Sequence, residues 1–90
     1  MERADTGSQV SGASRRFAML LFPGFPMMAF SAVIEPLRAA NALGAEPPYS
    51  WITVAPVGEP ITASNGITLT PDFAVGDDPA ADFIVVCSGG

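Results

Sequence analysis

The residues of this chain that could carry out covalent chemistry are few, and the first to consider is a single cysteine. Cys87 ends the apolar run Asp82–Cys87 and is followed by Ser88-Gly89-Gly90. A cysteine is a nucleophile when a neighbouring base or positive charge lowers its pKa. The sequence contains no histidine, which excludes histidine-assisted triads and common zinc sites for this segment. The apolar residues before Cys87 favour a buried cysteine that packs as a small hydrophobe, so we assign no catalytic residue.

Carboxylates are the other candidate chemical groups. Asp72, Asp77 and Asp78 lie in an acidic, proline-containing connection over residues 71–81. They have neither His or Cys neighbours nor the spacing of a calcium loop, so we predict a solvated loop and no metal site. Gly89-Gly90 follows a predicted strand, but the sequence has no G-x-G-x-x-G or lysine-containing phosphate loop. We therefore predict no cofactor.

Composition excludes one class of partner. The formal net charge is −5 with four basic residues, and 49% of the residues are hydrophobic. A chain with so few cations has no phosphate-binding face, so this segment by itself should not bind nucleic acid. The hydrophobic fraction predicts a buried interior. One cysteine permits no internal disulfide and fits a reducing compartment, so we expect a cytoplasmic protein.

The elements that would position these groups begin with an apolar stretch. Phe17–Phe22 is uncharged and predicts a strand covered on both faces, as in parallel sheets. The sequence Pro-Gly-Phe-Pro at Pro23–Pro26 forces a turn. From Met27 to about Leu43 the apolar residues recur at helical spacing, and Gly44 is a stop signal.

Pro36 lies inside this helix, where it removes one hydrogen bond and clashes with the preceding turn. Either the helix kinks at Pro36, or a first helix ends at Glu35 and a second begins with Pro36. We favour one kinked helix.

A membrane or export segment is the alternative for this region. Residues 17–34 are uncharged and follow Arg15-Arg16, which resembles an export signal of the twin-arginine type. The prolines and glycine within Pro23–Pro26 interrupt the run, and no cleavage site with a polar mature sequence follows. We therefore predict no membrane association.

Three further elements follow. SWITVA at residues 50–55 predicts a second strand, which with the first strand and the helix forms a parallel crossover unit. In PITASNGITLT, Asn65-Gly66 predicts a β-hairpin with a type I′ turn, in which both residues adopt positive φ. Asp82–Cys87 predicts a third buried strand. The predicted fold is therefore α/β: the start of a flavodoxin-like parallel-sheet sandwich, in the order β-α-β, β-hairpin, β, and incomplete.

The two ends of the sequence indicate how the domain is organised. Residues 1–15 are rich in small and polar residues without periodicity, which predicts a disordered leader. The chain ends just after a strand, where ligands bind in open α/β sheets. We expect a longer parent sequence. A complete small protein that dimerises through its open sheet edge is the weaker alternative.

Four segments together identify a family resemblance: LLFPGFPMMAF, IEPLRAAN, ITASNGITLTPD and DFIVVCSGG. Residues 16–90 resemble the amino-terminal domain of GlxA-type AraC-family transcriptional regulators, a domain similar to the PfpI and class I glutamine amidotransferase-like superfamily. The resemblance implies a sensor domain that continues through further strands and helices. It also implies a carboxy-terminal pair of helix-turn-helix units, absent from this sequence, that binds DNA.

The resemblance also implies function. It predicts the ligand-sensing, dimer-forming portion of a regulator of amine or amino-acid catabolism, with a small nitrogenous metabolite as effector and a homodimer in the full-length protein. The candidate ligand contacts are at the strand ends: Pro23, Gly24, Phe25, Ser88, Gly89 and Gly90. The alternative is a fragment of a PfpI-like cysteine hydrolase or amidase that uses Cys87. Counting from Gly24, the carboxylate of the enzymes is replaced by Ala29, so we predict that the chain is not an enzyme.

Overall fold

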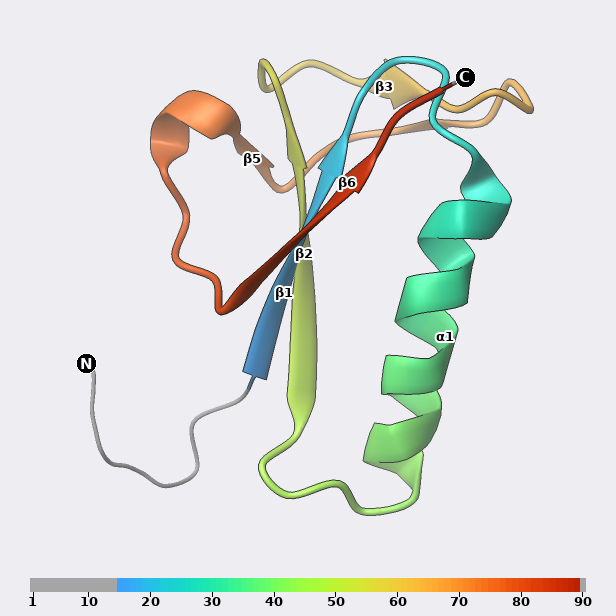
Figure 1. The fold of residues 1–90 in the computed structure, drawn as a ribbon. Coiled ribbons are helices and arrows are strands. Elements are labelled where there is room, and N and C mark those ends of the chain that lie inside the picture. Colours follow the sequence, from blue (N-terminus) through green and yellow to red (C-terminus); the bar gives the residue numbers. More distant parts are fainter. Residues whose placement is uncertain (1–14, 90) are drawn as a thin grey trace.

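A parallel β-sheet with one helix against it forms the body of the molecule (Figure 1). A computed structural model describes residues 15–89, so the predicted disordered leader over residues 1–14 and the candidate residue Gly90 lie outside the described part. Strand β1 (Arg15–Leu21) leads to helix α1 (Met27–Ala42) and strand β2 (Tyr49–Ala55). Arg15, which we had placed in the leader, is the first residue of β1.

The sheet has four parallel strands in the order β5-β2-β1-β6, with β5 at Phe73–Ala74 and β6 at Phe83–Cys87. β1 lies between β2 and β6, and Phe17 is the partner of Trp51 on one side and of Phe83 on the other. The predicted α/β fold with parallel strands is confirmed. The sheet reverses its strand order between β1 and β6, which is the position where open α/β folds form their ligand crevice.

Helix α1 runs through Pro36 without interruption, which confirms the favoured single helix and excludes the alternative of two separate helices. The predicted stop is confirmed, because Gly44 has φ +91° and its N–H donates to Asn41 O. The N–H of Ala45 donates to Ala40 O, which completes a Schellman motif and satisfies the last carbonyls of the helix. The bend at Pro36 stays a prediction.

The two faces of the sheet have different surroundings. Because side chains alternate along a strand, Met19 and Leu21 of β1 point toward α1, and both are fully buried. On this side the partly buried helix residues Met27, Phe30, Val33 and Ile34 pack against the core. The opposite face carries a smaller buried cluster of Ala18, Ile52 and Val54. Helix α1 lies on the other side of the sheet, and among the described residues 15–89 it is the only α-helix, so no α-helix covers this second face (Figure 1).

The prediction of a buried third strand is wrong for β6. Phe83, Ile84 and Val86 are 50%, 70% and 60% exposed. β6 is at the edge of the sheet as described, and Ile84 and Val86 point to the second face. The prediction that β1 is covered on both faces is wrong for the same reason, since Leu20 is only partly buried. An all-apolar sequence predicts the strand but not which neighbours cover it.

The predicted hairpin is confirmed, but its turn type is different. β3 (Ile61–Thr62) pairs antiparallel with β4 (Thr68–Leu69). Gly66 has φ +87°, whereas Asn65 is not among the described residues with positive φ. Gly66 N donates to Ala63 O, and Ala63 N donates to Ile67 O. The hairpin therefore has a three-residue loop, in which a type I turn is followed by Gly66 in the left-handed conformation. The predicted two-residue loop with a type I′ turn is wrong.

The acidic connection is more structured than predicted. It contains β5 and the short helix η1 (Val75–Asp77), which the sequence analysis missed. The N–H of Asp72 donates to Thr53 O at 2.9 Å, and its carboxylate accepts the Thr53 N–H at 2.8 Å. Asp82 forms the same pair with Arg16 of β1. In both cases an Asp-Phe dipeptide begins a parallel strand, so each aspartate fixes the register of the strand that it precedes.

Candidate functional site

The loop after β1 is a tight turn built by proline and glycine. Phe25 N donates to Phe22 O at 3.0 Å, with Pro23 and Gly24 between them. Gly24 has φ +81°, and proline followed by a glycine with positive φ is the sequence of a type II turn. The Gly24 N–H donates to Thr62 O at 2.8 Å. The turn is therefore fixed to the hairpin, and this N–H is not free to bind a ligand.

The loop after β6 meets this turn. Phe22 N donates to Cys87 O at 3.0 Å, which extends the pairing of β1 and β6 to the strand ends. A Cβ atom on Gly89 would be 2.4 Å from Gly24 O, closer than side-chain atoms come to a backbone oxygen. Only glycine allows this approach. Five of the six predicted ligand-contact residues are thus gathered at the switch point of the sheet, and Gly90 lies outside the described residues.

These five residues do not have equivalent positions. The Phe25 side chain is fully buried and packs edge-on against Phe30, with ring centroids 5.9 Å apart. Pro23 and Ser88 are exposed. Pro23, Ser88 and Gly89 are therefore the exposed residues at this switch point, while the buried Phe25 supports the turn.

Cys87 lies next to this crevice but is oriented into the core. Its exposed fraction is 4%, and it packs in the cluster that contains Met19, Leu21 and Phe25. Burial raises the pKa of the Cys87 thiol above its ordinary value of 9.0. An activated nucleophile needs the opposite shift. The arrangement agrees with our interpretation of Cys87 as a small core hydrophobe.

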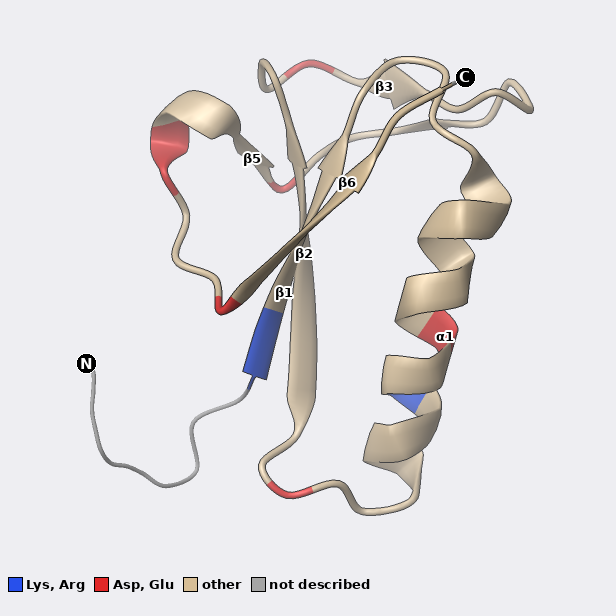
Figure 2. Cartoon of the chain, in the orientation of Figure 1, with Lys and Arg blue, Asp and Glu red and all other residues tan. Residues whose placement is uncertain are grey.

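Charged residues of the described chain form no metal site. Between residues 15 and 89, no three His, Cys, Asp or Glu side chains are grouped to hold a metal ion. Asp72, Asp77 and Asp82 each accept a backbone N–H, from Thr53, Ala74 and Arg16 respectively. In Figure 2 the basic positions among residues 15–89 lie at the start of β1 and on α1, away from the carboxyl ends of the strands. No helix in residues 15–89 has the length and apolar character needed to cross a membrane.

A first hollow that the sequence analysis missed lies near the carboxyl ends of β1 and β2. It has a volume of about 350 Å³. Its lining residues are Pro23, Ala55, Pro56, Val57, Glu59, Pro60, Ile61 and Thr62. The signal in the sequence was the run Pro56–Pro60 directly after a strand. Prolines cannot join the sheet, so they hold this segment away from it.

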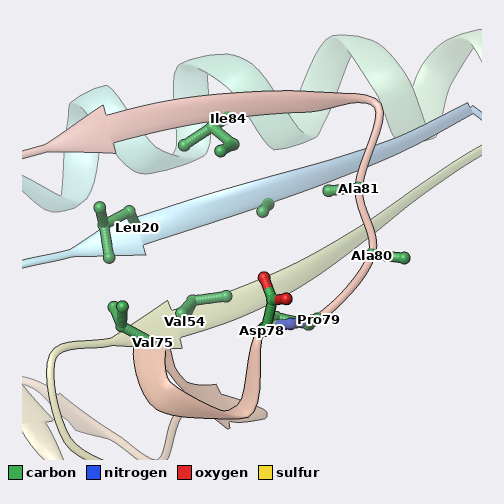
Figure 3. A pocket seen from close by; sticks show the side chains of 9 residues that line it. Leu20, Val54, Val75, Asp78, Pro79, Ala80, Ala81 and Ile84 are labelled. Atoms are coloured by element: carbon green, nitrogen blue, oxygen red, sulfur yellow. The ribbon is translucent and has the colours of Figure 1, made fainter.

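A second, larger hollow lies on the uncovered face of the sheet (Figure 3). Its volume is about 490 Å³. Leu20, Val54 and Ile84 from the sheet form one side, and residues of the segment from Val75 to Ala81, which leads to β6, border the hollow. Asp78 is the one ionisable residue among those that line it. Apart from Asp78, the residues that line this hollow are apolar. The hollow therefore resembles a surface for packing against another apolar segment more than a binding site with several polar groups.

Comparison with known proteins decides the family. The HTH-type transcriptional regulators GbdR and CdhR of Pseudomonas aeruginosa are 37% and 38% identical to the chain, over 78% and 84% of its length. The HTH-type transcriptional regulator GlxA of Rhizobium meliloti is 32% identical over 84% of the chain. No family model matches the sequence.

Two solved structures share the fold. An AraC family transcriptional regulator from Pseudomonas putida superposes with a TM-score of 0.73 at 23% identity, over 84% of this chain and 41% of that one. A DJ-1 superfamily protein from Agrobacterium tumefaciens superposes with a TM-score of 0.59 at 26% identity, over 83% of this chain and 38% of that one.

The chain corresponds to the amino-terminal, PfpI-like domain of a GlxA-type AraC-family regulator. It spans 19%, 22% and 24% of the lengths of GbdR, CdhR and GlxA. Within this domain, the four-stranded sheet and α1 of the GlxA-type chain bring the loops after β1 and β6 together.

Proposed function

We propose that this GlxA-type domain is the ligand-sensing and dimer-forming portion of a transcriptional regulator. The observation that carries the proposal is the meeting of the β1 and β6 loops at the switch point, where Gly89 lies against Gly24. In open α/β sheets this crevice is the usual place for a small ligand. A ligand there would contact both the loop after β1 and the loop after β6, the two strands between which the strand order reverses.

The proposed effector is a small nitrogenous metabolite, and the regulated genes are those of amine or amino-acid catabolism. The proposed contacts are Pro23, Gly24, Ser88, Gly89 and Gly90, with Phe25 behind them. A ligand that binds one arrangement of these loops better than another shifts the equilibrium toward that arrangement. Coupled to a homodimer, such a shift would reposition DNA-binding units.

DNA binding itself is proposed to reside in helix-turn-helix units outside this sequence. The formal net charge of −5 gives this segment no attraction for phosphates. A regulator of this kind would work in the cytoplasm, which is also where a reduced Cys87 is expected.

The proposal is tested with the complete reading frame that contains this sequence, expressed in a host that carries a transcriptional reporter. Single amines and amino acids are added in turn, and one of them is expected to change reporter output severalfold. Ser88→Trp, which fills the crevice, should abolish the response. Thr70→Trp is the control, because Thr70 is also exposed but lies after β4 and, among the described residues, makes no hydrogen bond to either loop.

Two results would overturn the proposal. One is a reading frame that encodes no DNA-binding units. The other is an effector response that Ser88→Trp leaves intact while the variant protein remains folded.

A further inference from the structure

The hollow at the carboxyl ends of β1 and β2 has mostly apolar walls. Pro23, Pro56 and Pro60 supply rigid rings, and Ala55, Val57 and Ile61 supply aliphatic groups. Its volume of about 350 Å³ is at the small end of the usual range for ligand sites. The hollow is therefore suited to a molecule with a short aliphatic body.

One charged group lines this hollow. Glu59 makes no hydrogen bond or ion pair with any other residue of the described range 15–89. The other polar side chain in the lining, the Thr62 hydroxyl, already shares a hydrogen bond of 2.7 Å with the Thr68 hydroxyl. The carboxylate is thus the free polar group of the hollow, and an ionised carboxylate only accepts hydrogen bonds.

We infer that this hollow binds a small organic ammonium ion through Glu59, with its aliphatic body against the proline and valine walls. A charge-assisted bond from N–H to carboxylate is stronger than a neutral one. The inference rests on the proposed sensor function for its biological meaning, but it places the ammonium group at Glu59, outside the crevice between the β1 and β6 loops.

The lining also sets a preference among ammonium ions. Quaternary ammonium groups are recognised by aromatic faces, and no aromatic residue lines this hollow. A quaternary ion also has no N–H to donate to Glu59. The site should therefore prefer a primary alkylammonium ion to a quaternary one.

The test is a titration of the isotope-labelled 90-residue chain with n-butylammonium, tetramethylammonium and 1-butanol, followed by amide chemical shifts in NMR. We expect n-butylammonium to shift the amides of residues 57–62 and to bind more tightly than the other two probes. Glu59→Gln should weaken its binding about fivefold, as for an exposed ion pair.

Glu46→Gln is the matched control. Both glutamates are exposed, both directly precede a proline, and both substitutions remove one negative charge. The control should bind n-butylammonium as the unchanged chain does. The amide spectra of both variants also report whether each one is folded.

The possible outcomes separate this inference from the sensor proposal. Equal binding of 1-butanol, or equal binding by Glu59→Gln, shows that the carboxylate is not used and overturns the inference. Shifts confined to residues 22–25 and 87–89 move the ammonium site to the other crevice, which overturns the inference and leaves the sensor proposal standing. Binding of n-butylammonium that Glu59→Gln weakens and Glu46→Gln does not supports the inference, whereas the sensor proposal stands or falls on the reporter response and its loss in Ser88→Trp.

Discussion

Asn41 of α1 pairs with the backbone of Tyr49 as if it were a neighbouring strand. Its side-chain N–H donates to Tyr49 O, and its side-chain oxygen accepts the Tyr49 N–H, both at 2.8 Å. The two bonds fasten the end of the helix to the first residue of β2. Asn41 is the last residue of the EPLRAAN segment, so the role of this residue in the segment is structural. Its Glu35 and Arg38 form an ion pair at the surface, with both side chains 60% exposed.

Replacing Asn41 by alanine should destabilise the fold by about 1–3 kcal/mol, because two partly buried backbone groups of Tyr49 lose their partners. The measurement is the free energy of unfolding in urea. Arg38→Ala is the control from the same segment, and it should cost less than about 0.5 kcal/mol, since an exposed i,i+3 pair contributes little. Equal losses in the two variants would contradict this interpretation of Asn41.

Gly89→Ala should lower the melting temperature, because its Cβ would be 2.4 Å from Gly24 O. Relief requires one of the two loops to move, at a cost of about 1–3 kcal/mol. Gly76→Ala is the control: nothing lies within 4 Å of its added Cβ, and its φ is not in the positive range. That variant should be neutral or slightly more stable. A Gly89→Ala chain as stable as Gly76→Ala would show that the two loops do not touch in solution.

Cys87 should react slowly with iodoacetamide in the folded chain at neutral pH, and rapidly once the chain is unfolded in urea. Burial both blocks access and raises the pKa of the thiol, so less thiolate is present. Mass spectrometry of the alkylated protein gives the two rates.

The raised pKa of Cys87 makes the stability of the fold depend on pH. The folded state favours the protonated thiol, so this contribution is complete below the ordinary pKa of 9.0 and is lost as the pH rises toward the higher folded-state pKa. The decline in stability above pH 9 should be smaller in Cys87→Ala than in the unchanged chain. Rapid labelling of the folded chain at pH 7 would instead reopen the hydrolase alternative.

The uncovered face of the sheet should bind a hydrophobic dye such as ANS. Val86 and Ile67 are 60% and 55% exposed, but only Val86 lies on that face, beside Leu20. Val86→Lys should therefore lower the dye fluorescence, because it places a charge within the apolar patch. Ile67→Lys, in the hairpin loop, should leave it nearly unchanged. The same fluorescence decrease in both variants would show that the dye does not bind the sheet face.

The sequence by itself determined the local elements. The apolar run after Arg16, the Pro-Gly turn, the helical spacing from Met27 and the Gly44 stop each depend on neighbouring residues, and each is found where predicted. It also placed the candidate ligand contacts at the carboxyl ends of predicted parallel strands, which share one edge of a sheet. The prediction of a type I′ turn at Asn65-Gly66 was wrong, because the same dipeptide occurs in hairpin loops of two and of three residues.

Only the tertiary structure decided which side chains are covered and which polar groups are engaged. The exposure of β6 depends on its place at the sheet edge, and the roles of Asn41, Asp72 and Asp82 depend on backbone partners 8, 19 and 66 residues away. The hollow at Glu59 likewise forms only when the segment after β2 folds back beside Pro23. Such contacts leave no periodic signal, because a hydrogen bond between distant residues is set by the path of the chain and not by the spacing of residue types along it.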